Sequence, residues 1–485
     1  MNAPTKLLEW PVPANDAGET GLWDAISLAR AIKGTANAEF AVAGVEIDSR
    51  DVQPGDLFFA LQGESMDGHR FIQMAIEKGA SAVVVDRECD MPNLRVSDTT
   101  DALVRLGAAA RERTKARIVG VTGSVGKTGV KEAIFAALDR SSRGRAHRSV
   151  KSYNNHVGVP LSLARMPARS RYGVFEMGMN HPGEIAALTR QVRPHVAVVT
   201  TIAPAHIEML GSEEAIADAK AEIFEGLEQG GTAIIPADSP HFERLRDVAL
   251  RCGAQTISFG SAAHANVRLL DVVAGIDGGS LVTVDMGDRR LCYTVAMPGA
   301  HWVANSLAVM ATVRAVGADL GAAGLALAEM AGLAGRGARI EVAAKGGMAL
   351  LIDESYNANP ASMAATLAQL GSESAKRRIA VLGAMKELGS HGPSYHAGIA
   401  TPLRAAGVDH VILVGEEMAA LAQELGKPAA DVLGKATPFD HCETVAQALE
   451  AVRALGLEGG DAVLVKGSNS VGLAKLVATL AGKED

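Results

Sequence analysis

The sequence predicts an α/β protein with three domains: a small α/β domain, a central mononucleotide-binding domain with a parallel sheet, and a Rossmann-like third domain. Three observations predict this class. The chain has 485 residues, about three times the roughly 150 residues of a usual domain. Apolar runs alternate with helical stretches along most of it, as in parallel sheets. A glycine-rich turn, "TGSVGKT", joins the apolar run "RIVGV" to a helical pattern.

The first two domains are expected at residues 1–112 and 113–335. In the first, "GVEIDSRDVQPGDLFFAL" and "GASAVVVD" contain strand-like segments around a Pro-Gly turn. In the second, we expect strands at "RIVGVTG", "YGVFEMG", "HVAVVTTI", "TAIIPAD" and "TISFGS". The alternating runs "VRLLDVVA" and "SLVTVDM", separated by "GIDGG", predict a hairpin. This hairpin would form a small antiparallel appendage on the central sheet.

The third domain is expected at residues 336–485. It repeats the strand and helix rhythm through "MALLIDES", "RIAVLGAM", "HVILVGE" and "AVLVKGS". This order is typical of a doubly wound sheet.

Composition excludes several classes of function. The chain is 48% hydrophobic and 21% charged, which favours ordered domains. Its net charge of -8 disfavours nonspecific binding to nucleic acid. We find no signal-peptide pattern and no apolar run of about 18 residues, so we expect a cytoplasmic protein with no membrane insertion. The four cysteines lack CxxC or His-partnered spacing, which argues against disulfides and zinc.

The turn "TGSVGKT" has the features of a phosphate-binding loop. Gly123 and Gly126 lie where a strand passes into a helix, and the backbone N–H groups and dipole of such a helix start form an anion site. Lys127 can reach the terminal phosphates of a nucleotide, and the Thr128 hydroxyl can ligate Mg²⁺. The strict GxxxxGK[ST] pattern is broken, because residue 121 is Val.

Three further residues stand where function is expected. Glu176 ends one apolar strand and His206 follows another, and the carboxyl ends of parallel strands present functional groups. Alone, each is more simply a solvated glutamate or a structural histidine. Lys220 falls on the apolar stripe of the helix "SEEAIADAKAEIFEGL", which Ser212 can cap. A snorkelling or ion-paired lysine and a neutral or modified one both fit this position.

Six stretches together resemble the Mur ligases, the ATP-dependent peptide ligases of peptidoglycan precursor synthesis. They are "TGSVGKT", "SYNNHVGVPLSL", "EMGMNHPGEI", "AHIEMLGSEEAIADAKAEIF", "HWVANSLAVMA" and "DESYNANPASM". The resemblance runs from about residue 44 to 473 and covers all three expected domains. Within the family, "EMGMNHPGEI" and "SYNANPASM" most resemble the member that joins D-alanyl-D-alanine to UDP-N-acetylmuramoyl tripeptide.

The resemblance implies a reaction and its cofactors, ATP and Mg²⁺. ATP would phosphorylate the terminal carboxylate of the tripeptide, and the amine of D-alanyl-D-alanine would attack the acyl phosphate. A carboxylate is a poor electrophile, so the protein must mainly position two anions and neutralise their charge. The family pattern makes Thr128, Glu176 and His206 metal contacts. It also aligns Lys220 with a carbamoylated lysine, whose oxygens suit Mg²⁺.

The resemblance assigns the remaining candidates residue by residue. The ATP contacts it implies are Gly123, Ser124, Val125, Gly126, Lys127, Thr128, Asn305 on the adenine side, Arg336 at the γ-phosphate and Asp353 near the ribose. Ser49 and Arg50 would contact the UDP part, and Asn154 and Asn155 the sugar and peptide. Tyr356, Asn357 and Asn359 would lie near the incoming dipeptide. Simpler interpretations are a loop-capping role for Asn154 and Asn155, a place on a polar helix face for Asn305, a linker charge for Arg336 and a strand-end cap for Asp353.

The chain departs from the family pattern at two positions and leaves alternatives open. Ala384 stands where an Asp is common, and Asn469 where an Arg is common, which affects local dipeptide contacts. The alternatives are a sister ligase that adds one amino acid, a folylpolyglutamate synthetase, and an ATP-binding regulatory protein without catalysis. The third residue of the tripeptide, meso-diaminopimelate or lysine, stays open. We expect a monomer that closes around its substrates at hinges near residues 112 and 335.

Overall fold

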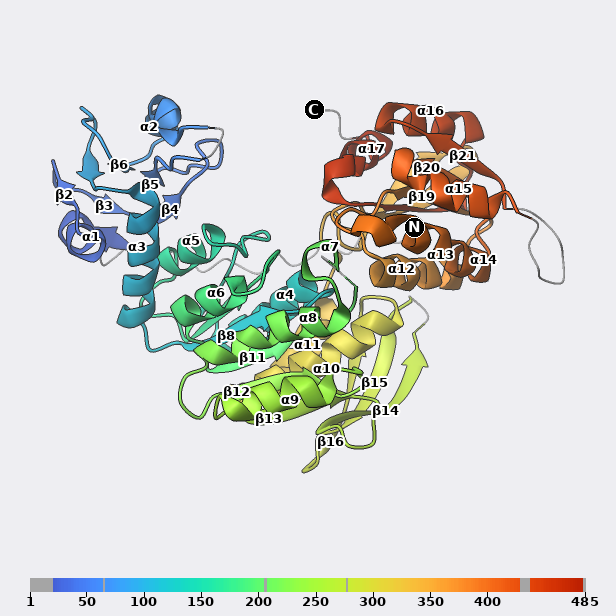
Figure 1. Cartoon of the computed structure of the whole chain (residues 1–485), viewed down its shortest axis with the longest axis horizontal. Helices are drawn as coiled ribbons and strands as arrows, with labels where there is room; N and C mark the ends of the chain where they lie inside the picture. The colour runs from blue at the N-terminus through green and yellow to red at the C-terminus, as the bar shows by residue number, and fades with distance from the viewer. Residues whose placement is uncertain (1–20, 64–65, 205–206, 276–277, 428–436, 483–485) are drawn as a thin grey trace, which may run out of the picture.

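The computed structural model describes residues 21–63, 66–204, 207–275, 278–427 and 437–482. The chain forms three parts, and the first and third lie on either side of the central one (Figure 1). Each part is built on its own main sheet. Within the described residues, every helix is too short or too polar to cross a bilayer. The predicted three-domain α/β class is therefore correct.

The first part has a five-stranded sheet that is parallel except at one edge. Its strands, in spatial order, are β2 (Thr35–Ala36), β7 (Asn93–Arg95), β6 (Ala82–Val85), β5 (Asp56–Phe59) and β4 (Gly44–Glu46). A two-stranded ribbon of β1 (Trp23–Asp24) and β3 (Ala41–Val42) and the helices α1 (Ala25–Ile32), α2 (Ile72–Glu77) and α3 (Thr99–Arg113) complete it. Strand β2 pairs antiparallel with β7.

The central part has a nine-stranded sheet. In spatial order its strands are β16 (Arg290–Val295), β15 (Ser280–Asp285), β14 (Val267–Ala274), β13 (Gln255–Gly260), β12 (Thr232–Pro236), β11 (Val196–Val199), β8 (Arg117–Thr122), β10 (Tyr172–Glu176) and β9 (Ala146–Arg148). Its helices are α4 (Lys127–Ser142), α5 (Gly158–Ala164), α6 (Glu184–Val192), α7 (Ile207–Leu210), α8 (Glu213–Ala221), α9 (Phe242–Arg251), α10 (Ala300–Ala315) and α11 (Leu320–Glu329). All five strands predicted between residues 117 and 260 are present.

The predicted hairpin is confirmed and extends this sheet. Strands β14 and β15 pair antiparallel up to Ala274 opposite Ser280, and β15 pairs in the same way with β16. Residues 276 and 277 of the turn lie outside the described residues. Alternation along β15 explains this pairing, because Val282 and Val284 are buried on one face of the strand while Leu281 faces outward.

The third part has a six-stranded sheet, parallel except for its first strand. Its strands, in spatial order, are β17 (Ala338–Ala344), β18 (Gly347–Glu354), β22 (Ala462–Lys466), β19 (Arg378–Gly383), β20 (His410–Val414) and β21 (Phe439–Cys442). Its helices are α12 (Pro360–Ser372), α13 (Gly392–Gly398), α14 (Ala400–Ala405), α15 (Ala419–Leu425), α16 (Val445–Leu455) and α17 (Leu473–Leu480). The four strands predicted here are confirmed.

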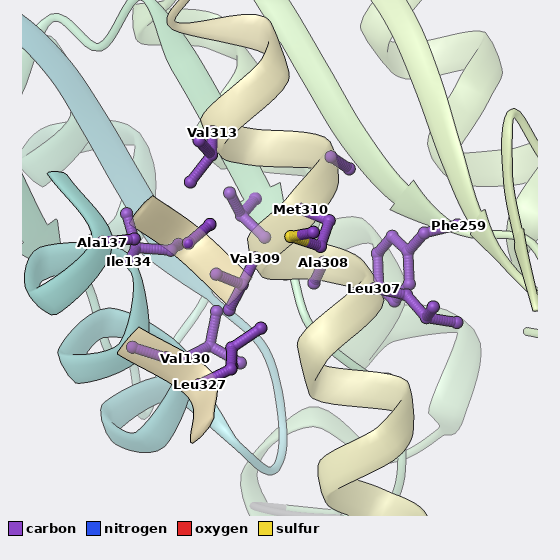
Figure 2. Packing of buried hydrophobic residues seen from close by; sticks show 14 of the residues in the cluster. Val130, Ile134, Ala137, Phe259, Leu307, Ala308, Val309, Met310, Val313 and Leu327 are labelled. Carbon is purple, nitrogen blue, oxygen red and sulfur yellow. The ribbon is translucent and has the colours of Figure 1, made fainter. Parts of the chain in front are cut away.

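Helix α4, which begins at the glycine-rich loop, is held by a buried apolar core. Val130 and Ile134 on α4 lie against Val309 on α10, and Leu327 of α11 closes the same cluster (Figure 2). On the opposite face of the sheet, α5, α6, α8 and α9 supply a second core. Strand β8 lies between β10 and β11 in the middle of this layered part, so the loop after it stands at the carboxyl edge of the sheet.

Candidate active site

The loop between β8 and α4 adopts a conformation that its glycines permit. Gly123 has φ 144° and Gly126 has φ 85°, both in the region that side chains disfavour. Lys127 Nζ donates to the Gly123 carbonyl at 2.8 Å and so curls over the loop. Because the first turn of a helix leaves its amide N–H groups without helical partners, the start of α4 offers donors and a positive dipole to an anion.

The loop is fastened to the segment that follows β11. The Ser124 amide donates to the Thr201 carbonyl at 2.7 Å, and Thr200 Oγ1 donates to the Val125 carbonyl at 2.5 Å. A Cβ on Gly123 would stand 2.0 Å from Thr200 Oγ1. The loop is therefore tightly fitted and pre-shaped before any ligand binds.

A chain of polar side chains lies beside the loop. Thr128 Oγ1 donates to Glu176 Oε2 at 2.8 Å, and Asn154 Nδ2 donates to Glu176 Oε1 at 2.8 Å. Glu176 is the last residue of β10 and is completely buried. The structure thus brings together three candidates that are up to 48 residues apart in the sequence.

The side chains of Thr128, Glu176 and Asn154 offer oxygen atoms of the kind that Mg²⁺ prefers. The Thr128 hydroxyl and the Glu176 carboxylate fit such an ion, since both are held in place and lie beside the phosphate loop. Among the described residues, no three His, Cys, Asp or Glu side chains form a group that could hold a metal by themselves. His206, the other predicted contact, lies outside the described residues.

Lys220 is buried on α8, as the helical stripe predicts. Ser212 caps this helix by accepting the Ala215 amide at 3.2 Å, also as predicted, but the α-helix ends at Ala221 and continues as a 3-10 turn. Lys220 is 1% exposed. Burial and then the charge of Lys127 hold the pKa of Lys220 well below its usual range, while Glu222 and Glu184 oppose the shift. A lysine in this setting favours its neutral amine.

A cavity of about 410 Å³ opens over the loop and is shared with the third part. The predicted residues that line it are Ser124, Val125, Gly126, Lys127, Asn154, Glu176, Asn305, Arg336, Tyr356, Asn357 and Asn359. Arg336 crosses between the two parts: its guanidinium lies 4.1 Å from the centre of the Tyr356 ring and donates to Ser152 Oγ at 3.1 Å. Burial lowers the pKa of Lys127, Glu176 opposes the shift and Arg336 adds to it.

Two of the lining residues have structural roles visible in the fold. Asn359 caps α12 by accepting the Ser362 amide at 2.9 Å. Asn305, on α10, stands so close to Gly126 that a Cβ there would lie 2.9 Å from its side-chain oxygen. The helix that supports α4 from behind therefore also reaches its loop.

The other candidates lie outside the cavity lining. Asp353 braces the linker by accepting the Gly335 amide at 2.7 Å and the Ser355 hydroxyl at 2.6 Å. Asn155 is exposed and accepts the Val157 amide at 3.2 Å and the Gly158 amide at 2.9 Å, so it fastens the loop that leads into α5. Both contacts match the simpler interpretations given above, and their ligand roles stay predictions.

Ser49 and Arg50 lie in the first part, away from this cavity. Arg50 forms a two-point ion pair with Asp48, with distances of 2.9 and 2.7 Å, and its side chain is 81% exposed. Ser49 is buried and its hydroxyl lies 3.3 Å from Met74 Sδ. Their predicted contacts to a diphosphate stay untested.

Sequence reasoning missed Lys466, which ends β22 and lines the same cavity. Its side chain is 2% exposed, and Nζ donates to the Asn357 carbonyl at 2.9 Å and to Glu354 Oε2 at 3.4 Å. Burial lowers the pKa of Lys466, against the opposing charge of Glu354. A signal existed, because Lys466 follows the apolar run "AVLV" just as Glu176 ends "GVFE".

Three family models match the chain. Residues 41–140 match the model described as "Mur ligase family, catalytic domain", residues 121–313 "Mur ligase middle domain" and residues 338–469 "Mur ligase, glutamate ligase domain". The UDP-N-acetylmuramoyl-tripeptide--D-alanyl-D-alanine ligase of Escherichia coli (strain K12) is 35% identical, over 91% of this chain and 94% of the relative. The ligase of the same name from Bacillus subtilis (strain 168) is 33% identical, over 94% and 97%.

Solved structures give the same result. MurF from Acinetobacter baumannii aligns with a TM-score of 0.80 at 29% identity, covering 95% of this chain and 99% of that one. The MurF ligase from Thermotoga maritima in complex with ADP aligns with a TM-score of 0.72 at 25% identity, covering 91% and 97%. The similarity extends over all three parts of the fold. The chain belongs to the Mur ligase family.

Proposed function

We propose that this chain joins D-alanyl-D-alanine to UDP-N-acetylmuramoyl tripeptide, with ATP converted to ADP and phosphate. One observation carries the proposal: Lys127 of the central part and Arg336 of the linker to the third part line one cavity beside the Thr128, Glu176 and Asn154 chain. Relatives that align over nine-tenths of the chain carry this activity in their names. The reaction would take place in the cytoplasm, with the enzyme acting as a monomer.

The first step transfers a phosphoryl group. An oxygen of the tripeptide carboxylate attacks the γ-phosphorus of ATP, the bond to the bridging oxygen breaks, and ADP leaves. The protein must hold two anions in line and neutralise the charge on the transferred group. Lys127, the start of α4 and Arg336 supply that positive charge. Asn305 lies beside the loop where it can contact the nucleotide, and Asp353 would set the linker near the ribose.

The second step forms the peptide bond. The amine of D-alanyl-D-alanine attacks the carbonyl carbon of the acyl phosphate, phosphate leaves with the bonding electrons, and the amine loses a proton. Tyr356, Asn357 and Asn359 line the third-part side of the cavity, from which the dipeptide would enter. Asn154 and Asn155 would contact the sugar and peptide, and Ser49 and Arg50 the UDP part. Ala384 and Asn469 lie in the third part, and their effect on dipeptide contacts is open to the same assay.

Thr128 and Glu176, with His206, would hold Mg²⁺, which when bound neutralises phosphate charge. Lys220 would act as its carbamate. The neutral amine favoured by burial attacks the carbon of CO₂, an N–C bond forms as one C=O π pair moves onto oxygen, and the nitrogen loses a proton, so a neutral group becomes an anion with two oxygen atoms. We assign residues 1–112 to binding of the UDP substrate, residues 113–335 to ATP binding, and residues 336–485 to the incoming dipeptide and closure around ATP.

ADP release tests the proposal. Purified protein is supplied with Mg²⁺, ATP and UDP-N-acetylmuramoyl tripeptide, and the acceptor is D-Ala-D-Ala, D-Ala, D-Glu, L-Lys or none. Release that depends on D-Ala-D-Ala supports the proposal. Release with a single amino acid reassigns the chain to a sister ligase, and binding of ATP without release under any condition makes it a regulatory protein. Tripeptides ending in meso-diaminopimelate and in lysine, compared in parallel, identify the natural substrate.

A further inference from the structure

A basic hollow lies at the amino ends of the central strands, at the opposite edge of the sheet from the phosphate loop. Its volume is about 600 Å³. We call this cavity the basic hollow. Six cations line it: Arg113, Lys115, Arg117, Arg145, Arg169 and Arg171. Strand β8 runs from Arg117 to Thr122, and six residues span about 20 Å, so the hollow is separate from the ATP site.

The strand register fixes the arginines of the hollow side by side. Arg117 begins β8, while Arg145 and Arg171 directly precede β9 and β10. The Arg117 amide donates to the Arg171 carbonyl at 3.0 Å, and the Arg171 amide donates to the Arg145 carbonyl at 2.7 Å. Three guanidinium groups therefore start from adjacent positions on one rim, and their grouping follows from the fold.

These cations lack carboxylate partners, whereas two other cations of the chain near them in sequence have one. Arg111 pairs with Glu228 at 3.1 Å and Arg148 pairs with Glu132 at 2.9 Å. Across the part of the chain that the structure describes, none of the six residues of the basic hollow lies within ion-pair distance of an Asp or Glu. The chain as a whole has a net charge of -8, so this cluster of unpaired cations gives the face a local charge opposite to that of the whole protein.

Arg113 differs from the other five cations of the hollow in being half-buried rather than exposed. Its guanidinium lies 3.4 Å from the centre of the Trp23 ring and donates to the carbonyls of Leu22 and Met166. Burial lowers the pKa of Arg113 to about 10. The carbonyls satisfy hydrogen bonds but do not neutralise the charge, so an anion in the hollow would stabilise this side chain.

We propose that the basic hollow binds an oligophosphate, a chain of two or more phosphates that is either inorganic or part of a free nucleotide. Arginine recognises phosphate oxygens through paired donors, and several arginines in a small concave site match a compact multiple anion. A membrane surface fits less well, because no exposed large apolar side chain among the described residues lines the hollow. A nucleic acid also fits less well, because the aromatic residue that lines it, Tyr172, is 2% exposed and offers no ring for stacking.

Calorimetric titration of the full chain tests this proposal. Inorganic tripolyphosphate, UTP and orthophosphate are titrated at low salt into wild type and into Lys127→Ala, which weakens binding at the ATP loop. The hollow variant carries Arg117→Gln, Arg169→Gln and Arg171→Gln, all exposed positions. The matched control carries Arg30→Gln, Lys376→Gln and Lys475→Gln, exposed cations on the other two parts that lose the same charge.

We expect tripolyphosphate to bind Lys127→Ala, and the hollow variant in that background to bind about a hundredfold more weakly, while the control binds as before. UTP binding more tightly than tripolyphosphate would identify a nucleotide as the ligand; equal binding would identify the phosphate chain. Equal affinities in the hollow and control variants would overturn the proposal. So would hollow-dependent binding of an RNA oligonucleotide or anionic vesicles without binding of tripolyphosphate. ADP release by the hollow variant with Lys127 intact should be unchanged, and it reports separately on the ligase reaction.

Discussion

Replacing Lys466 with methionine should slow the ligase even under conditions where the variant is fully folded. Methionine keeps the length of the side chain but removes the charge, so Nζ no longer donates to the Asn357 carbonyl at 2.9 Å. A hydrogen bond from a charged donor contributes about 1.5 to 3 kcal/mol. Since about 1.4 kcal/mol corresponds to a factor of ten, we expect kcat/KM to fall about tenfold to a hundredfold if the lysine positions Asn357 and the substrate.

The assay is ADP release at varied D-Ala-D-Ala and ATP, together with thermal unfolding. Lys475→Met, at an exposed position of the same part, is the control. Lys466→Met also leaves Glu354 without its buried partner, so Glu354→Gln added to it should recover stability but not rate. A variant that loses stability yet keeps kcat/KM within about twofold of wild type would refute the positioning role.

Three further predictions concern the loop, the modified lysine and pH. Gly123→Ala should weaken ADP binding about tenfold or more, as measured by calorimetry. The added methyl group would strain the backbone at φ 144° and collide with Thr200 Oγ1, which together cost about 1 to 3 kcal/mol. Wild-type affinity would show that the loop adapts. Lys220→Ala should abolish ADP release, and short carboxylic acids should restore part of it; wild-type turnover without them would exclude the carbamate. Burial lowers the pKa of His147 to about 4 from 6.5, so the unfolded chain binds more protons between these values and stability should fall as pH drops through them. The urea midpoint of His147→Gln should depend less on pH over that range, and an unchanged dependence would assign the effect to other groups.

The sequence predicted the parts of the fold that rest on local patterns. Strands β11, β20 and β22 are nearly continuous apolar runs, and buried parallel strands have that composition. The stripe that buries Lys220 follows from helix periodicity, and the cap at Ser212 follows from a serine placed just before the helix. The short edge strand β9, at Ala146–Arg148, has no apolar run, because it lies at the sheet edge and its residues are only partly buried. The pairing of β9 with β10 therefore could not be predicted from the sequence.

The site was predictable where motifs are local and not where it depends on strand order. The loop and Glu176 each follow an apolar strand, so their position at a carboxyl edge could be inferred. Lys466 reaches the cavity because β22 lies between β18 and β19, a neighbourhood that joins segments more than 100 residues apart. Arg336 meets Ser152 across 184 residues. Such long-range contacts depend on tertiary packing, which cannot be predicted from the periodicity of the sequence.

Helix α10 gives the molecule a link between its interior and its nucleotide site. One side of it packs on α4, while Asn305 on the same helix reaches Gly126 of the loop. A change of volume at an interior position such as Val309 would therefore be transmitted to the loop without touching ATP. Weakened alleles of this enzyme should show a raised KM for ATP at temperatures where the fold is still intact. The repertoire of tolerated substitutions in this core is then set by nucleotide affinity as well as by folding.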